Sequence, residues 1–147
     1  MNWFIAAPTP GRGNGSNPND ANGDGLPDSW QLLFWSSIND PQAAPGADPD
    51  ADGFNNLQEF LAGTVPTSGT SFLQIDSVQV SGANRTIHFT AVAGKTYTIL
   101  YKDKLDDTFW QPLANVPAQG STGPITISDS SSASNTRFYR LITPQLP

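Results

Sequence analysis

Acidic and amide side chains recur at alternate positions in two stretches of this chain, a spacing that can hold a hard metal ion. The second stretch, Asp48 to Glu59, fits the loop pattern D-x-[DN]-x-[DN]-G-x5-E at every defined position. The first, Asp20 to Gln31, fits everywhere except the last position, where Gln31 replaces the acid. Calcium takes about six to eight oxygen ligands. We therefore expect two calcium ions, one in each loop.

The expected ligands follow from their positions in the loop. Alternate side chains, the last side chain and one backbone carbonyl after the central glycine would face the ion. They are Asp20, Asn22, Asp24, Leu26, Asp28 and Gln31 in the first loop, and Asp48, Asp50, Asp52, Phe54, Asn56 and Glu59 in the second. Glu59 offers two charged oxygens and Gln31 one neutral oxygen, so the second site is expected to bind calcium more tightly.

Charge supports a cation in both loops. Eight acidic residues and no lysine or arginine lie between Asp20 and Glu59, and the net charge of the chain is −6. Such a cluster repels itself unless cations neutralise it. The alternative is a solvated acidic loop built from turn-forming aspartate and glycine. The negative field also opposes nucleic acid, and no apolar run reaches membrane-spanning length, so neither nucleic-acid binding nor membrane insertion is expected.

Each loop leads into a short amphipathic helix, predicted over residues 28–35 and 56–63. The apolar stripes are Trp30, Leu33 and Phe34 in the first helix and Leu57, Phe60 and Leu61 in the second. Gly63 is a predicted C-cap. Because the loop–helix unit is repeated, we expect the two helices to pack together through these stripes.

Strand patterns replace helix patterns after about residue 69. Six β-rich segments are predicted at residues 72–80, 85–91, 95–101, 109–113, 124–128 and 136–142. Polar turns separate them, which predicts a small antiparallel β-sandwich. The expected fold class is therefore mostly β, a sandwich preceded by a duplicated calcium loop–helix subdomain.

Three parts are predicted along the chain. Residues 1–17 are expected to be a remnant strand and linker, residues 18–68 the paired calcium-binding repeats, and residues 69–147 the sandwich. The chain has no cysteines, so calcium would replace disulfides as the staple of a small domain. No signal peptide is visible. The linker-like opening leads us to expect a piece of a longer secreted protein.

The paired loops resemble the thrombospondin type 3-like calcium repeats of large secreted bacterial proteins. The resemblance rests on Asp24-Gly-Leu-Pro-Asp28-Ser-Trp30-Gln31 and on Asp52-Gly-Phe-Asn-Asn56-Leu-Gln-Glu59-Phe60-Leu-Ala-Gly63-Thr64. Dockerins, which duplicate a similar loop but have longer helices, are a more distant likeness. The strand half contains Tyr97-Thr-Ile-Leu-Tyr101, Trp110-Gln-Pro-Leu113 and Phe138-Tyr-Arg140. On these residues it resembles the small β-domain that often follows such repeats. The resemblance implies an extracellular or cell-surface, metal-binding structural module of EF-hand-like loops.

Little in the chain indicates catalysis. His88 is the sole histidine and falls on the outward face of its predicted strand. No glycine-rich phosphate loop joins a strand to a helix, and calcium explains the paired carboxylates better than a glycosidase does. We expect a monomeric, non-enzymatic, calcium-binding spacer at the C-terminal end of a larger secreted or surface protein.

Two other functions remain open from the sequence. The strand half could be an adhesion or carbohydrate-binding module, with Trp110, Tyr101 and Tyr139 as a stacking platform, although aromatic residues in a small sandwich more often form its core. Alternatively, the loops could dock on another extracellular protein as dockerins do. Arg137 and Arg140 are expected to pair with surface carboxylates.

Overall fold

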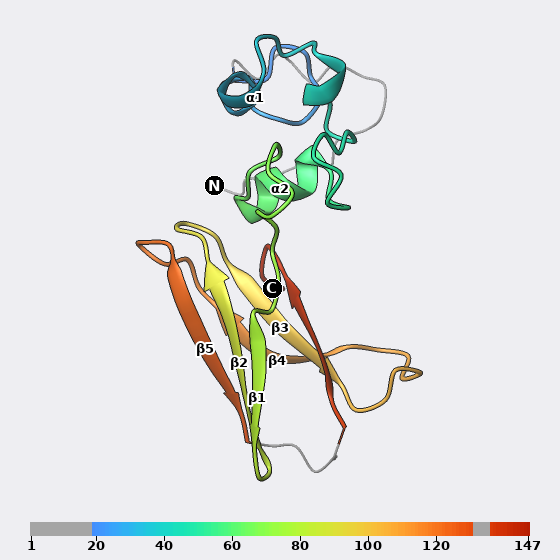
Figure 1. Cartoon of the computed structure of the whole chain (residues 1–147), viewed down its shortest axis with the longest axis vertical. Helices are drawn as coiled ribbons and strands as arrows, with labels where there is room; N and C mark the ends of the chain where they lie inside the picture. The colour runs from blue at the N-terminus through green and yellow to red at the C-terminus, as the bar shows by residue number, and fades with distance from the viewer. Residues whose placement is uncertain (1–18, 131–135) are drawn as a thin grey trace, which may run out of the picture.

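The computed structural model describes residues 19–130 and 136–147. The remnant strand and linker predicted at residues 1–17 lie outside the described residues. Within the described part, most regular structure is strand, arranged in two antiparallel sheets, with two short α-helices. Figure 1 shows the helices at one end of an elongated molecule and the sheets at the other. No helix in these ranges has the length and apolar character needed to cross a bilayer.

The two α-helices follow the acidic loops directly. Helix α1 spans Asp28–Phe34 and helix α2 spans Asn56–Ala62. A capping box between Asn55 and Gln58 satisfies the first turn of α2. The helix ends at Gly63, which adopts the left-handed conformation with φ of 80°. Both predicted helices and the predicted C-cap are therefore confirmed.

A single 3-10 turn, η1 (Pro41–Ala43), lies between the two α-helices. Asp40 caps it, because its carboxylate accepts a hydrogen bond from the Gln42 N–H at 2.9 Å. The side chain of Ala43 is fully buried. What the sequence presented as a plain connector is thus a capped and packed element.

Aromatic side chains join the two helices. The ring centroids of Trp30 and Phe60 lie 5.5 Å apart in an edge-to-face arrangement, which confirms the predicted contact between the stripes. The prediction is wrong for Leu33, which is 74% exposed, and holds only in part for Leu57 and Leu61, which are 39% and 41% exposed. Helix α1 instead buries Gln31 completely. Leu33 lies two residues further on, about 200° round the helix, and so faces solvent.

All six predicted strands are present. One sheet has the order β1-β2-β5 and the other the order β4-β3-β6, and every pairing is antiparallel. The strands are β1 (Ser77–Ser81), β2 (Asn84–Ala91), β3 (Tyr97–Lys102), β4 (Gln111–Val116), β5 (Gly123–Asp129) and β6 (Phe138–Ile142). Residues 72–76, 95–96, 109–110 and 136–137, which were predicted to be strand, lie outside these elements.

Side chains from both sheets share one hydrophobic core. Phe89 and Ala91 of β2 cluster with Tyr97 and Ile99 of β3 and with Val116 of β4. The rings of Phe89 and Tyr97 meet at 5.3 Å. Apolar and polar residues alternate along β2, and the structure buries the apolar side, as that alternation predicted.

A buried ion pair also links the sheets. Arg137, just before β6, donates hydrogen bonds to Asp129 on β5 and to Asp103, both at 2.8 Å. The hydroxyl of Tyr139 donates to the same Asp129 carboxylate at 2.7 Å. Burial and this hydrogen bond raise the pKa of Tyr139 above its usual value. The Asp129 side chain is fully buried, so the expectation that Arg137 pairs with surface carboxylates is wrong for this partner.

Helix α2 is anchored to the strand half by Lys95. Its Nζ donates to the Phe60 carbonyl at 2.6 Å and lies 5.1 Å from the Phe60 ring centroid. That carbonyl belongs to the last turn of α2, where carbonyl groups have no N–H partner within the helix. A positive charge is favourable at this end of a helix. Phe54 stacks on Phe72 at 6.1 Å, making a second contact at this joint.

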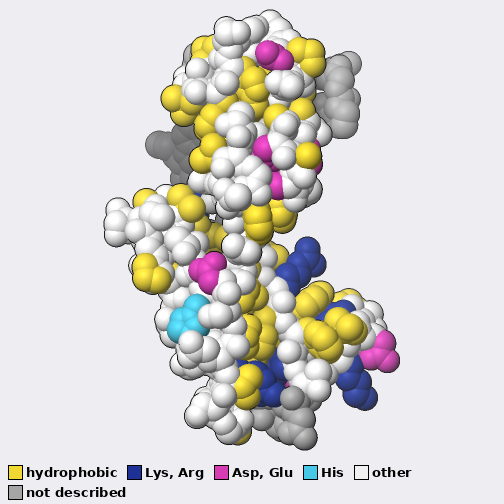
Figure 2. Space-filling model, viewed as in Figure 1, with side chains coloured by type: hydrophobic (Ala, Val, Ile, Leu, Met, Phe, Trp, Pro, Cys, Tyr) yellow, Lys and Arg dark blue, Asp and Glu magenta, His cyan; other side chains and the backbone are white. Residues whose placement is uncertain are grey.

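Charge is divided between the two ends of the molecule. The helical end carries the eight acids of residues 20–59 and no lysine or arginine. In Figure 2, the lysine and arginine side chains on the visible face lie over the strand half. The acids of the helical end therefore have no basic side chains within their own half to neutralise them.

Candidate metal centre

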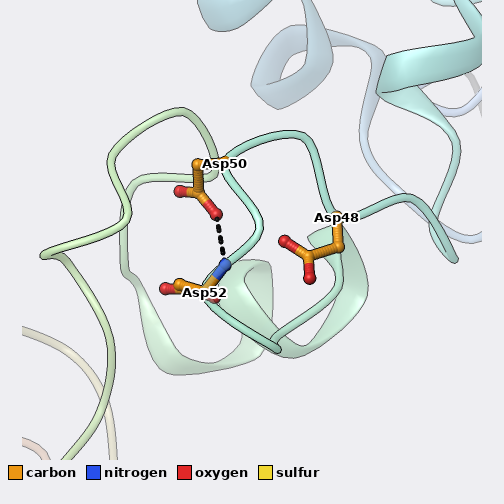
Figure 3. Close-up of side chains that lie close together, drawn as sticks. All are labelled: Asp48, Asp50 and Asp52. Atoms are coloured by element: carbon orange, nitrogen blue, oxygen red, sulfur yellow. Dashed lines mark hydrogen bonds between the residues drawn. The ribbon is translucent and has the colours of Figure 1, made fainter.

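The second acidic loop gathers three carboxylates immediately before α2. One oxygen from each of Asp48, Asp50 and Asp52 lies within 4.8 Å of the other two, and Figure 3 shows the three side chains around one turn of the chain. In residues 19–130 and 136–147, this is the single group of three potential metal-binding acids, cysteines or histidines at such distances. Glu59 of α2 is not one of these three, but it is 1% exposed and its carboxyl is influenced by their charges.

The electrostatic environment of Glu59 places it against this cluster. Burial and the charges of Asp50, Asp52 and Asp48 together raise the pKa of its carboxyl to about 7, and burial contributes most. The Thr64 hydroxyl donates to Oε1 at 3.2 Å, which opposes that shift. Oε2 is buried without a hydrogen-bond partner. A buried carboxylate beside three others is unfavourable unless a cation or a proton neutralises it.

The backbone fixes the orientation of the Asn56 amide. Its Nδ2 donates to the carbonyls of Gln42 and Ala44, each at 2.7 Å. The side chain is fully buried, and Oδ1 has no hydrogen-bond partner. Because the oxygen and nitrogen of a planar amide point in different directions, these bonds turn Oδ1 away from the connector. Position nine of a calcium loop needs such an oxygen.

Buried polar atoms without partners concentrate at the expected ligands. In the described part of the chain, six buried side-chain nitrogen or oxygen atoms have no hydrogen-bond partner. Five are oxygens of expected ligands, namely Gln31 Oε1, Asp50 Oδ2, Asp52 Oδ2, Asn56 Oδ1 and Glu59 Oε2; the sixth is His88 Nε2. Native proteins leave few such atoms unpaired because each costs about 1–3 kcal/mol. The donor set therefore fits a cation.

The two loops share one backbone conformation. The fourth position has a positive φ in both, 70° at Gly23 and 61° at Ala51. The sixth position has 95° at Gly25 and 94° at Gly53. The N–H of each of these sixth residues donates to the first aspartate of its own loop, at 3.1 Å in both cases. The sequence repeat is thus also a repeat of local geometry.

The seventh residues, Leu26 and Phe54, hold the same place in each loop. Their N–H groups donate to Asp24 Oδ1 and Asp52 Oδ1 respectively, both at 2.9 Å. Leu26 is fully buried, whereas Phe54 is 36% exposed and stacks on Phe72. These bonds curl the backbone of both loops alike at this position.

Amide side chains satisfy the acids of the first loop. Asn22 Nδ2 and Gln31 Nε2 both donate to Asp24 Oδ2, at 2.9 and 2.8 Å. Asp28 Oδ1 accepts from the Ala21 N–H at 2.9 Å. Asp20, Asp24 and Asp28 therefore do not form a cluster like that of the second loop. A cation here would require the Asn22 and Gln31 amides to give up their bonds to Asp24.

The one histidine lies away from the acidic loops. His88 projects from the face of β2 opposite the core, as predicted, and its Nδ1 lies 3.1 Å from Thr126 Oγ1. Its Nε2 is buried without a partner, so the ring is not fully solvated. The neighbour that the structure gives to this ring is a threonine, not the carboxylate of a catalytic set.

Intramolecular contacts engage the three aromatics considered for sugar stacking. The Arg137 guanidinium lies 4.0 Å from the centroid of the Tyr101 ring. The hydroxyl of Tyr139 is bound to a buried carboxylate. The Trp110 ring lies 5.3 Å from Lys102 Nζ. The three rings therefore already have partners within the chain.

The contribution of the connector did not emerge from the sequence. The carbonyls of Gln42, Ala43 and Ala44 accept hydrogen bonds from the amides of Gln31 and Asn56. Every residue has a backbone carbonyl, so the residue types of the connector do not show which carbonyls accept hydrogen bonds. The spacing of the loop residues could not reveal these bonds either. The one available signal was Asp40 followed by proline, which is typical of a capped turn.

Comparison of the chain with models of known families, with curated proteins and with solved structures finds no match. A functional assignment therefore depends on the geometry of the two loops and on the chemistry of their side chains.

Proposed function

We propose that the protein is a non-catalytic calcium-binding spacer module, with one calcium ion in each loop of residues 18–68. The observation that carries this proposal is the set of five buried, unpaired oxygens at expected ligand residues. The donors are oxygens only and rich in carboxylate, which suits calcium, a hard cation. Magnesium fits less well because it demands a smaller octahedral shell.

The second loop would form the stronger site. Its ion would be held by Asp48, Asp50, Asp52, Asn56 and Glu59 together with the backbone carbonyl of Phe54. The ion would neutralise carboxylates that now face one another. Thr64 and the connector carbonyls would orient Glu59 and Asn56, as outer partners commonly orient metal ligands.

The spacer role follows from the place of the loops in the molecule. Helix α2 is tied to the strand half through Lys95, so an ion beside α2 would hold the acidic segment against a fixed support. We also infer that the two three-stranded sheets form a β-sandwich, since their side chains share one core. The resemblance to thrombospondin type 3-like repeats favours an extracellular or surface location at the C-terminal end of a larger protein.

Calorimetric titration with calcium chloride tests the proposal. We expect two ions per chain, and we expect Glu59→Gln to weaken the tighter site because a charged ligand becomes neutral. Asp106→Asn is the matched control, since it removes the same charge from an exposed residue in the strand half and should leave both sites intact. The proposal fails if the wild type binds no calcium or if Glu59→Gln leaves both sites unchanged.

A further inference from the structure

Three successive carbonyls of the connector serve both acidic loops. The Gln42 and Ala44 carbonyls accept from Asn56 Nδ2, each at 2.7 Å, and the Ala43 carbonyl between them accepts from Gln31 Nε2 at 3.0 Å. Gln31 closes the first loop, and Asn56 belongs to the second. Ala43 and both amide side chains are fully buried.

These bonds determine where the two amide oxygens point. Gln31 Oε1 and Asn56 Oδ1 are both buried without hydrogen-bond partners. Each amide is planar, so a bond from its nitrogen to the connector fixes the side on which its oxygen lies. Gln31 Nε2 also donates to Asp24 Oδ2 at 2.8 Å, and an ion in the first loop would displace that bond and leave the Ala43 carbonyl as its acceptor. An ordered connector would then hold each amide oxygen on the side away from itself, and a disordered connector would hold neither.

We propose that residues 40–44 couple the two cation sites, so that filling one site raises the affinity of the other. This inference rests on the proposed calcium binding. An ion in the second loop fixes Asn56, Asn56 fixes the connector, and the connector orients Gln31. By linkage, an ion in the first loop must raise the affinity of the second loop by the same factor.

The fraction of molecules with an ordered connector determines how strongly the two sites are coupled. When only a fraction of molecules has an ordered connector, the apparent affinity of either empty site falls by that fraction. A first ion orders the connector, and the second ion then binds at its intrinsic affinity. We define the coupling factor as the Kd of the first loop with the second loop silenced, divided by its Kd with the second loop filled. Coupling of this kind commonly reaches roughly 5- to 150-fold.

Asp40 allows the connector to be tested without touching a ligand. Its carboxylate caps η1 through the Gln42 N–H at 2.9 Å, and it is not among the expected ligands. Asp40→Ala removes both the cap and one charge, whereas Asp40→Asn removes the same charge and keeps a good cap. A cap contributes about 1 kcal/mol, which corresponds to about a fivefold change in an equilibrium.

The full chain is titrated with calcium. Calorimetry monitors the titration, and so does the fluorescence of Trp30 and Trp35, which lie on and beside α1. The Asp48→Ala, Asp52→Ala double variant silences the second loop. In Asp40→Ala we expect the Kd of the first loop to rise about fivefold when the second loop is silenced, and to stay unchanged when it is filled. The coupling factor then rises about fivefold, while Asp40→Asn keeps the wild-type value.

Each other outcome is decisive. Two ions that bind with a coupling factor of one would overturn this inference and leave the proposed function standing. No calcium binding at all would overturn the proposed function itself. If Asp40→Ala raises the calcium Kd of the first loop by the same factor whether the second loop is silenced or filled, the defect is local. The connector then does not couple the two sites. Pro41→Gly loosens the same exposed turn and should repeat the Asp40→Ala result.

Discussion

The two loops differ in how they satisfy their own acids. In the first, the amides of Asn22 and Gln31 donate to Asp24 and take the place of a cation. At the same two positions the second loop has Asp50 and Glu59, which cannot donate. Two exchanges of amide for acid thus separate a loop whose amides satisfy part of its acids from one whose carboxylates require a counter-ion.

The fourth position of each loop offers a matched pair of substitutions. Ala51 has φ of 61° where the first loop has Gly23 at 70°. A Cβ is unfavourable in this region, and an added Cβ at Gly23 would touch nothing within 4 Å. With calcium bound, Ala51→Gly should raise the free energy of unfolding by about 0.5–1 kcal/mol, after allowing for the freedom of glycine in the unfolded chain, and Gly23→Ala should lower it similarly.

Urea denaturation at saturating calcium measures both changes. Ala93→Gly is a control, because Ala93 is exposed and does not have a positive φ. That control should lose stability. If Ala51→Gly loses stability as Ala93→Gly does, the strained backbone assigned to the fourth position is wrong.

Helices and strands were predictable because their signals are local. Asn55 and Gln58 cap α2 within one turn, and Gly63 ends it. Strands β2 and β5 each carry a local alternation of buried and more exposed residues. The acidic loops were predictable for the same reason, since every expected ligand of one loop lies within a dozen residues.

Contacts between distant segments could not be predicted from the sequence. The order β1-β2-β5 and β4-β3-β6 depends on pairings between residues far apart in the chain. Arg137 was expected to pair with surface carboxylates, whereas one of its partners is the fully buried Asp129. Leu33 fits the helical stripe, but the burial of Gln31 turns it outward. The local sequence pattern does not determine which distant residue a side chain contacts in the folded chain.

The contact of Lys95 with α2 links this helix to the strand half, and mutation of Lys95 can test that link. Burial lowers the pKa of its amino group, and its Nζ satisfies the Phe60 carbonyl at the end of α2. Lys95→Met keeps most of the stem but loses this hydrogen bond. With calcium bound, we expect the free energy of unfolding to fall by roughly 1–2 kcal/mol, the usual range for a charged hydrogen bond with partial exposure.

Chemical denaturation of Lys95→Met should be compared with Lys104→Met, which removes the same charge from an exposed residue of the strand half. The control should change stability by less than about 0.5 kcal/mol. Equal losses in the two variants would show that the Lys95 contact does not hold α2 to the strands.

The strand half has what an independent fold needs. Residues 71–147 carry six basic and five acidic side chains, and the buried core cluster lies within this range. We expect a protein comprising only these residues to melt cooperatively in chelator. Differential scanning calorimetry decides the matter, and a melt without a cooperative transition would show that the strands depend on the calcium-binding half.

The acidic half, by contrast, should depend on its cations. Residues 20–62 carry eight acids, no lysine or arginine, and little more regular structure than two seven-residue helices. Such a segment buries too little apolar surface to offset its chain entropy. A calcium concentration about 100 times Kd adds roughly 2.7 kcal/mol per site, enough to order it.

Small-angle X-ray scattering of the full chain in calcium, in magnesium and in chelator measures this ordering. In calcium, we expect the elongated shape of Figure 1, with α1 held beyond α2 and the strands. In chelator, the acidic half should expand because its like charges repel, and the radius of gyration should rise. Magnesium should resemble chelator, because its octahedral shell suits a bidentate glutamate poorly. Identical profiles in the three buffers would show that calcium does not organise the molecule, and the spacer would then lack a mechanism.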